Sequence, residues 1–391
     1  MKVGEAGMRF DFATATRILF GPGVVREVAP AAKEMGARAL LVTGSRKERA
    51  GLLIEAMQTE GIGCVCLAVR AEPSVTVVCQ GVELARREQC DLVIAFGGGS
   101  AIDAGKAAAA LLTSDGNPED YLEVIGKGKQ LTRPSAPCIA IPTTAGTGSE
   151  VTSNAVLASP EHSVKVSMRS PLMLPRLALV DPELTYNLPP EITASTGLDA
   201  LTQLVEPYTS TRANPITDAL CLKGMRCVAR SLTSAFQHGH DAAAREDMAL
   251  ASLFGGLALA NAGLGIVHGI AGPIGGKFSA PHGAICARLL PHAMEVNVVA
   301  LEKRLRRSEA LRRYDDIARN LTGDKTAKAS DGVAWVKDLC GSLRVPPLAS
   351  YGMSLEDFPE LIERADRASS TKGNPIRLTR DEMLQILARA L

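Results

Sequence analysis

Residue types that bind divalent metals occur in two segments of the second half of the chain. Asp199 and Gln203 are four residues apart in a helical pattern, which places both side chains on one face. His268 and His282 follow in an apolar, glycine-rich segment that also holds His292. One carboxylate and two imidazoles suit Fe(II) or Zn(II) and leave positions open for a substrate oxygen. A buried histidine is equally well explained as a core residue, so the spacing alone leaves both interpretations open.

A glycine-rich turn in the first half of the chain predicts a phosphate-binding site. Gly97, Gly98 and Gly99 follow the apolar segment Asp91–Phe96 and precede an alanine-rich helical pattern. Glycine lets the backbone approach a ligand closely and adopt positive φ without steric cost. Ser100 stands at the predicted N-cap, and the free N–H groups of a first helical turn attract anions. An ordinary strand–helix turn would explain one glycine but not three in succession.

A second polar segment follows another apolar strand pattern. Residues 141–156 carry six hydroxyl side chains among small residues. Hydroxyl groups and exposed N–H groups can bind a diphosphate or a nicotinamide carboxamide. The alternative is a plain polar loop. The candidates for ligand binding are Thr143, Thr144, Thr147 and Ser149.

Composition narrows the class of protein without naming a function. The chain has 391 residues, 46% of them hydrophobic, and a net charge of +1. This charge gives no electrostatic reason to expect nucleic acid or an anionic membrane as a partner. No apolar run reaches the roughly 20 residues of a membrane span, and the first twenty residues lack the apolar core of a signal peptide. The nine cysteines form no CxxC pair, so we expect a reduced, cytoplasmic protein.

The first half of the chain alternates strand and helix patterns, which predicts a parallel sheet covered by helices. The predicted strands are Ala39–Val42, Gly63–Leu67, Asp91–Phe96 and Cys138–Ile141, and the clearest helices are Glu48–Glu60 and Val75–Glu88. The opening segment Phe10–Gly23 is interpreted as a hairpin or an edge segment of the sheet.

Helical patterns dominate from about Pro189 onward. Asn214 and Pro215 predict an N-cap and first residue, and Asp247–Ala262 predicts a buried central helix. Two capping-box patterns precede further helices, at Ser354 to Asp357 and at Thr379 to Glu382. We therefore expect an α/β domain over 1–188 and an all-α domain over 189–391, with the active site in the cleft between them.

The chain resembles the iron-dependent (group III) alcohol dehydrogenases over essentially its whole length. The motifs that carry the resemblance occur in the family's order and spacing: FGPG at 20–23, GGGSAIDAGK at 97–106, PTTAGTGSEVT at 142–152, ALVDPEL at 178–184, GLDALT at 197–202, VHGIAGPIGG at 267–276, PHGAICARLLPHAMEVN at 281–297 and GNP at 373–375. The resemblance implies the dehydroquinate synthase-like fold, with a dinucleotide-binding domain and a helical metal domain. It also implies reversible hydride transfer between NAD(P)H and an aldehyde or ketone, and we expect a homodimer.

The resemblance also assigns residues to two sites. The cofactor-binding residues would hold the pyrophosphate, the ribose and the nicotinamide; they are Gly44, Ser74, Gly97, Gly98, Gly99, Ser100, Asp103, Thr143, Thr144, Thr147, Ser149 and Lys165. The metal site would consist of Asp199, Gln203, His268 and His282, of which the aspartate and the histidines are also catalytic.

Two departures from the family pattern concern the metal. The family's fourth ligand is a histidine where this chain has Gln203, whose neutral amide binds Fe(II) or Zn(II) more weakly than imidazole. The histidine that serves the family as a proton relay is replaced by Gly272. The related maleylacetate reductases transfer hydride without a metal, so a metal-independent oxo-acid reductase, with Lys277 in the role of the cation, is an alternative.

The segment after the first predicted strand bears on the choice of cofactor. NAD-specific members place an aspartate at the position of Gly44, where it binds the ribose hydroxyls and repels a 2′-phosphate. Here the carboxylate is absent, and Arg46 and Lys47 follow. This favours NADP(H) or dual use, although a solvated basic loop would have the same sequence.

The sequence therefore predicts an NAD(P)H-dependent alcohol dehydrogenase or carbonyl reductase that acts on a small molecule, with Fe(II) or Zn(II) polarising the carbonyl. The first alternative is the metal-independent oxo-acid reductase. A dehydroquinate synthase-like cyclase or lyase and a non-catalytic NAD(P) sensor are further alternatives.

Overall fold

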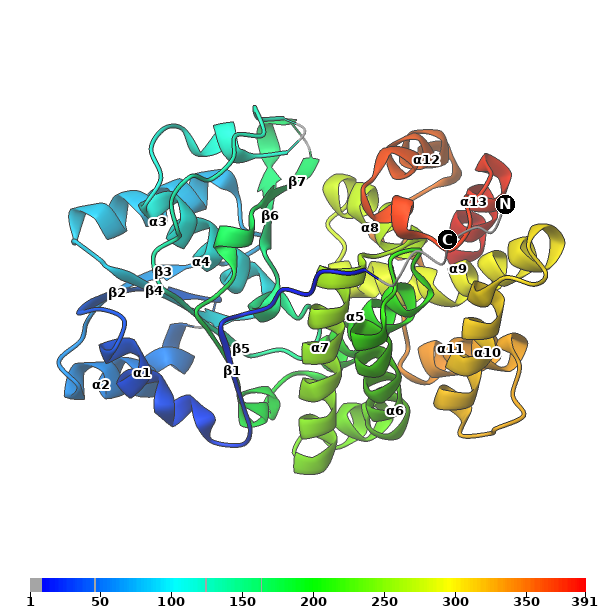
Figure 1. Cartoon of the computed structure of the whole chain (residues 1–391), viewed down its shortest axis with the longest axis horizontal. Helices are drawn as coiled ribbons and strands as arrows, with labels where there is room; N and C mark the ends of the chain where they lie inside the picture. Colours follow the sequence, from blue (N-terminus) through cyan, green and yellow to red (C-terminus); the bar gives the residue numbers. More distant parts are fainter. Residues whose placement is uncertain (1–8, 46, 124, 163) are drawn as a thin grey trace.

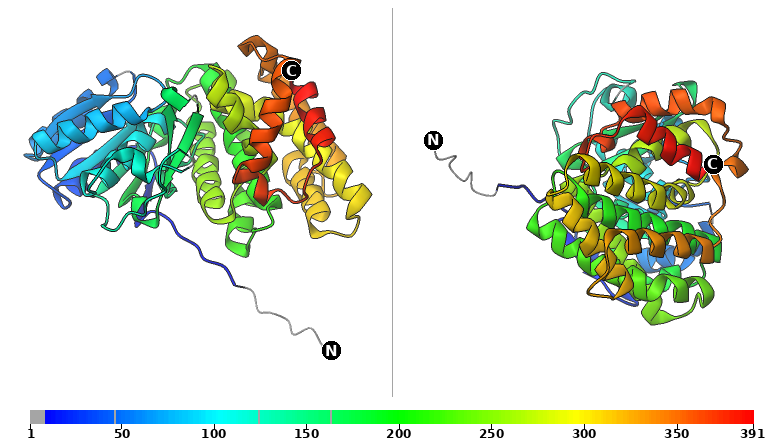
Figure 2. Two further views of the ribbon diagram at one scale, coloured as in Figure 1. Left: turned by 90° about the horizontal axis from the view of Figure 1, so that it is seen from above. Right: turned by 90° about the vertical axis from the view of Figure 1, so that its right-hand side faces the viewer.

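The structure is a computed structural model that describes residues 9–45, 47–123, 125–162 and 164–391. An α/β region and a helical region lie side by side along the long axis (Figures 1 and 2). The α/β region contains a six-stranded parallel sheet in the order β1-β8-β5-β4-β2-β3. Its strands are β1 Arg17–Phe20, β2 Arg38–Thr43, β3 Gly63–Ala68, β4 Leu92–Gly97, β5 Cys138–Pro142 and β8 Leu177–Val180. An antiparallel hairpin, β6 Asn154–Ser159 and β7 Val164–Arg169, lies outside this sheet.

Helices cover both faces of the sheet, as its alternating side chains require. Leu40 and Val42 of β2 pack in one core cluster with α3 (Val75–Arg87) and α4 (Gly99–Leu112). The intervening residues Ala39 and Leu41 pack in a second cluster with α1 (Val28–Lys33) and α2 (Gly51–Thr59). Figure 1 shows the two helix pairs on opposite sides of the strands.

The order of the strands creates a crevice at the carboxyl ends of β2 and β4. The chain continues from β2 to the outer strand β3, and then returns to place β4 on the other side of β2. The connections that leave β2 and β4 therefore diverge, which is the usual ligand site of open parallel sheets. The glycine-rich turn follows β4 at this point.

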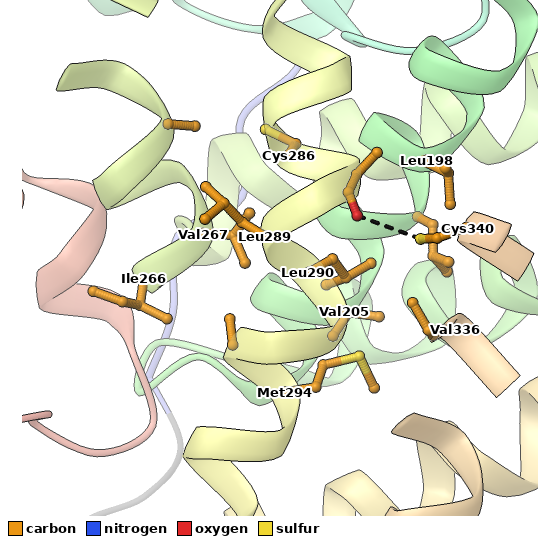
Figure 3. Packing of buried hydrophobic residues seen from close by; sticks show 14 of the residues in the cluster. Leu198, Val205, Ile266, Val267, Cys286, Leu289, Leu290, Met294, Val336 and Cys340 are labelled. Atoms are coloured by element: carbon orange, nitrogen blue, oxygen red, sulfur yellow. Dashed lines mark hydrogen bonds between the residues drawn. The ribbon is translucent and has the colours of Figure 1, made fainter. Parts of the chain in front are cut away.

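The remaining chain is helical, as the sequence predicts. The helices are α5 Pro190–Thr209, α6 Pro215–Gln237, α7 Ala242–Ala262, α8 Ile266–Lys277, α9 His282–Arg304, α10 Glu309–Thr322, α11 Ala329–Ser342, α12 Phe358–Arg367 and α13 Arg380–Ala390. Figure 3 shows Leu290 and Met294 of α9 in the core of this region, together with residues of α5, α8 and α11. By length and composition α9 could cross a membrane, as could α7 and α8 taken as one bent span, but 78% of the apolar window of α9 is buried inside the protein.

The four predicted strands and both predicted helices of the first half are present, with ends shifted by a few residues. The caps at Asn214, Ser354 and Thr379 form as predicted. Of the two interpretations of Phe10–Gly23, the edge segment is correct and the hairpin is wrong, because β1 is an edge strand that runs parallel to β8. The strand β8 and the β6–β7 hairpin are absent from the prediction.

The glycine-rich turn differs from the prediction in two details. The N-cap of α4 is Gly98, so Ser100 lies inside the first turn of the helix. None of the three glycines has positive φ. Close packing explains two of them instead: a Cβ on Gly97 would lie 2.7 Å from that of Ala101, and a Cβ on Gly99 would lie 2.8 Å from Cγ2 of Thr147.

A contact between two glycines joins the α/β region to the helical region. Gly148 has φ of +59°, and a Cβ on it would collide with the backbone of Gly256 in α7. A Cβ on Gly256 would likewise collide with Gly148. The backbone of the hydroxyl-rich loop after β5 therefore lies directly against a helix of the other region.

Candidate metal and dinucleotide site

The structure brings together three of the predicted metal ligands from three helices. Asp199 lies in α5, His268 lies in the first turn of α8, and His282 begins α9. Oδ1 of Asp199 lies 3.6 Å from Nε2 of His268 and 3.9 Å from Nε2 of His282. This Oδ1 is buried and has no hydrogen-bond partner. Because an uncompensated buried carboxylate oxygen is costly, the site is suited to a bound cation.

A fourth group at this cluster, Cys286, is absent from the sequence prediction. Its Sγ lies 3.6 Å from Nε2 of His282 and 3.9 Å from Nε2 of His268. The ligand atoms of Asp199, both histidines and Cys286 all lie within 4.8 Å of one another. The spacing of His282 and Cys286, one helical turn apart, is the sequence signal that could have identified the thiol.

A buried carboxylate holds His268 in the orientation that a metal ligand needs. Oε2 of Glu206 lies 2.7 Å from Nδ1 of His268, and Oε1 accepts the backbone N–H of Val267 at 2.6 Å. With Nδ1 directed at Glu206, Nε2 faces Asp199 and would offer its lone pair to a metal that displaces the proton. A metal-bound histidine is usually oriented by such a partner. Glu206 lies seven residues after Asp199 on α5, and sequence reasoning missed it.

Gln203 has a contact that the sequence did not indicate. Its Nε2 donates a hydrogen bond of 3.0 Å to Oδ2 of Asp199. The opposite orientation of the amide would place two oxygens against each other. Gln203 therefore fixes the Asp199 carboxylate, and its own Oε1 is buried without a partner.

The pKa values of Asp199 and His282 indicate that the cluster holds a negative carboxylate next to positive charge. Burial acts to raise the pKa of Asp199, but the imidazoles of His268 and His282 beside it outweigh burial, and the pKa is lowered. Cys286 raises the pKa of His282 to about 8 against the effect of burial. The cluster thus favours an ionised carboxylate beside a cation.

Other predicted groups lie apart from the cluster. His292 is farther along α9, and burial lowers its pKa to about 4. The Lys277 ammonium forms ion pairs with Asp357 at 2.8 Å and Glu360 at 2.7 Å, so nearby carboxylates already balance its charge. A Cβ on Gly272 would meet nothing within 4 Å, so the position of the family's relay histidine borders open space.

The predicted cofactor residues of the turns gather at the crevice of the sheet. Gly44 follows β2, and its backbone N lies 3.1 Å from the Cβ position of Gly97 at the end of β4. A Cβ on Gly98 would meet only Thr144, at 3.5 Å, so the outer side of the turn is open. Thr144 and Thr147 are partly exposed beside it. The crevice is thus lined by backbone N–H groups and two hydroxyls, as a diphosphate requires.

Three other predicted cofactor residues make contacts inside the protein. Asp103 accepts the hydroxyl of Ser149 and, at 2.9 Å, the N–H of Val156. Thr143 and Ser149 are buried. The buried Lys106 ammonium donates to the backbone of the same loop and lies 3.2 Å from Asp103. These contacts hold the loop in place, and their role toward a cofactor stays a prediction.

Ser74 and Lys165 lie together at the side of the β6–β7 hairpin. Ser74 caps α3 and forms a bridge to Ala158, which pairs with Lys165. Lys165 forms an ion pair of 3.0 Å with Glu72 and borders a cavity of about 460 Å³. The opposite wall of this cavity is the segment 275–281, immediately before His282. The cavity therefore lies between the two regions of the protein. Arg46 lies outside the described residues.

Comparison with known proteins identifies the family. The model "Iron-containing alcohol dehydrogenase" matches residues 15–182, and "Fe-containing alcohol dehydrogenase family, C-terminal" matches residues 193–391. The chain belongs to the iron-containing alcohol dehydrogenase family. It is 38% identical to alcohol dehydrogenase 4 of Schizosaccharomyces pombe over 379 residues, which cover 95% of this chain and 87% of the relative.

Solved structures of two oxidoreductases agree with this assignment. The crystal structure of a 1,3-propanediol oxidoreductase superposes with a TM-score of 0.90 at 34% identity, covering 98% of this chain and all of that chain (100%). Sulfoacetaldehyde reductase from Bifidobacterium kashiwanohense in complex with NAD⁺ gives 0.87 at 30% identity, covering 98% of this chain and 99% of that chain.

Membership in the iron-containing alcohol dehydrogenase family confirms several predictions. The predicted fold is correct, and the protein is an oxidoreductase that acts on CH–OH groups with a nicotinamide cofactor and a divalent metal. The metal-independent and cyclase alternatives are not favoured. The preference for NADP(H) stays a prediction.

Proposed function

We propose that this protein interconverts a small alcohol and its aldehyde or ketone, with the metal held by Asp199, His268 and His282. The observation that carries the assignment is the buried, unpartnered Oδ1 of Asp199 between two imidazole nitrogens. The donor set of oxygen and nitrogen atoms suits Fe(II) or Zn(II). When bound, the metal would polarise the carbonyl of the substrate and the nicotinamide would carry the hydride.

The cofactor in this proposal occupies the crevice at β2 and β4. The N–H groups of Gly98, Gly99 and Ser100 at the start of α4 bind the pyrophosphate. Thr144 and Thr147 donate hydroxyl hydrogen bonds beside them. The full cofactor-binding set is Gly44, Ser74, Gly97, Gly98, Gly99, Ser100, Asp103, Thr143, Thr144, Thr147, Ser149 and Lys165. Because open space surrounds Gly44, the 2′-phosphate of NADP(H) meets no repelling carboxylate there.

Water delivers the proton in this proposal. Glu206 keeps a proton on Nδ1 of His268, which makes this histidine a fixed ligand and not a proton donor. No titratable side chain stands at Gly272. The side chain of His282 is 37% exposed, so solvent reaches the cluster from that side.

The cavity between the two regions supports a small substrate. The cavity has a volume of about 460 Å³ and lies between Lys165 and the segment before His282. The named relatives act on short molecules, 1,3-propanediol and sulfoacetaldehyde among them, and we infer the same size class here. The pairing of Lys277 with two carboxylates argues against its use as a substitute for the metal.

The remaining proposals concern the domain boundary, the oligomeric state, the cellular location and the partners of the protein. A boundary between domains at 188/189 is supported by the start of α5 at Pro190 and by the limits of the two family models. The protein would be a cytoplasmic homodimer without nucleic-acid or membrane partners, and the absence of disulfides among the nine cysteines is consistent with a reducing compartment. Light scattering of the purified protein tests the dimer.

The experiment that tests the function combines metal analysis with turnover. We expect purified protein to oxidise NADPH or NADH with small aldehydes, to lose this activity after chelation, and to regain it with Fe(II) or Zn(II). Asp199→Asn should bind less metal, whereas the surface variant Glu191→Gln, on the same helix, should match the parent protein. Full turnover of metal-free protein, unchanged by added metal, would overturn the proposal.

A further inference from the structure

We propose that Cys286 is the fourth protein ligand of the metal, through its Sγ, in place of the family's histidine at position 203. The site would then be Asp–His–His–Cys and would prefer Zn(II) to Fe(II). This inference rests on the proposed role of Asp199, His268 and His282. It adds a ligand from this chain's own sequence and changes the identity of the metal.

The spacing of the donor atoms matches tetrahedral coordination. Zinc bonds of about 2.0–2.1 Å to nitrogen and 2.3 Å to sulfur place two tetrahedral ligands roughly 3.3–3.6 Å apart. Sγ of Cys286 lies 3.6 Å and 3.9 Å from the two imidazole nitrogens. Oδ1 of Asp199 lies 3.6 Å and 3.9 Å from the same nitrogens. These four distances exceed the tetrahedral spacing by only a few tenths of an ångström, and all four donor atoms lie within 4.8 Å of one another.

The position of Gln203 supports the replacement of the family's histidine ligand by Cys286. Its amide nitrogen, which cannot bind a cation, faces Asp199 at 3.0 Å. Gln203 therefore orients a ligand through Oδ2 and leaves Oδ1 directed at the cluster. The imidazole missing from α5 is replaced by a thiol from α9, on the same face as His282 and one turn beyond it.

The charge of the donor set determines the preferred metal. An aspartate and a thiolate together balance a divalent ion, and the thiol proton passes to water when the metal binds. Thiolate is a soft ligand that favours zinc over iron at a tetrahedral site. A substrate oxygen would enter as a fifth ligand, from the exposed side of His282.

Cobalt(II) is the most direct probe, because a thiolate bound to it gives a charge-transfer band in the near ultraviolet. Metal-free protein would be loaded with one equivalent of Co(II) as the parent and as Cys286→Ala, Gln203→Leu and Cys340→Ala variants. Cys340 is the matched control: it is also a buried thiol packed on α9, where its Sγ donates to the Ala287 carbonyl at 3.4 Å, on the other side of the helix from Cys286 (Figure 3). Circular dichroism checks that each variant is folded.

We expect the band in the parent protein, in Gln203→Leu and in Cys340→Ala, and its loss in Cys286→Ala. X-ray absorption of the zinc-loaded parent should show one sulfur at about 2.3 Å, absent from Cys286→Ala. In anaerobic competition between equal Zn(II) and Fe(II), the parent should retain mainly zinc, and Cys286→Ala should reduce the Zn/Fe ratio at least tenfold.

Two results would overturn the inference in different ways. Stoichiometric cobalt without a thiolate band, and a spectrum unchanged by Cys286→Ala, would leave the three-residue site intact and remove Cys286 from it. Cobalt binding that is absent from the parent, or unaffected by Asp199→Asn, would remove the proposed metal site itself.

Discussion

Oε2 of Glu206 lies 2.7 Å from Nδ1 of His268, and both side chains are at least nine-tenths buried. The pair links α5 to the first turn of α8. A Cβ on Gly265, the N-cap of α8, would lie 2.9 Å from Oε1 of Glu206, so the helix begins where only glycine fits comfortably. The orientation of a metal-facing imidazole is thus built into the junction of two helices.

Glu206→Gln should weaken metal binding without removing a ligand. The neutral amide is a poorer acceptor for the His268 N–H, and loss of such a partner lowers metal affinity about 10–100-fold. Titration of metal-free protein with Zn(II) against a chromophoric chelator measures the change. Glu191→Gln, on the surface of the same helix, serves as the control, and equal affinities for the two variants would contradict the role of Glu206.

Gly98→Ala and Gly99→Ala should have different effects. A Cβ on Gly98 meets no protein atom closer than 3.5 Å, so the fold should persist while NAD(P)H affinity falls by about 1–3 kcal/mol through contact with the phosphates. A Cβ on Gly99 would lie 2.8 Å from Thr147, so this variant should also lose thermal stability. Calorimetry and thermal unfolding distinguish the two effects. Normal cofactor binding by folded Gly98→Ala would show that the pyrophosphate lies elsewhere.

Gly44→Asp should shift the cofactor preference toward NADH. The new carboxylate would have open space, would accept hydrogen bonds from the ribose hydroxyls, and would repel a 2′-phosphate. Charged hydrogen bonds of this kind contribute about 1.5–3 kcal/mol, so the ratio of the dissociation constants for NADPH and NADH should rise at least tenfold. Gly44→Asn is the uncharged control. An unchanged ratio in Gly44→Asp would place the ribose away from β2.

Glu150 should make the stability of the protein depend on pH. Burial raises the pKa of this carboxyl to about 7, from the ordinary value of 4.5, against the charge of Lys106. The folded state therefore binds the proton more tightly than the unfolded chain. Its contribution is fully present below about pH 4.5 and is lost as the pH rises to about 7.

Glu150→Gln should flatten this dependence. Between pH 5 and pH 8, the parent should lose more unfolding free energy than the variant, by of the order of 3 kcal/mol. Denaturant unfolding at the two pH values measures the difference, and Glu191→Gln should retain the slope of the parent. Parallel slopes for the parent and Glu150→Gln would mean that Glu150 is ionised in the folded protein.

The sequence predicted those parts of the fold whose signals are local. The strand that ends at Gly97 and the helix that follows are contiguous, and so are the caps at Asn214 and Thr379. The strand β8 is only four residues long and pairs with β5 and β1, which are distant in sequence, so no local pattern indicates it. The β6–β7 hairpin is local in sequence, and the prediction nevertheless missed it.

The residues of the candidate site likewise divide into those with a sequence signal and those without one. Asp199, His268 and His282 are metal-binding residue types in a recognisable order, and they meet in space. The sequence analysis assigned no role to Cys286, because a cysteine in an apolar helix is usually a core residue. The partner of Glu206 is 62 residues away along the chain, so its role depends on how α8 packs against α5.

The contact between Gly148 and Gly256 has a consequence for how the two halves of the active site are kept in register. The phosphate-binding loops belong to one region and the metal cluster to the other, so the gap that a hydride must cross is not fixed within either. It is fixed where these two backbones touch, by the absence of two methyl groups. An alanine at either position would push the halves apart and lengthen the path from nicotinamide to carbonyl while every ligand stayed in place.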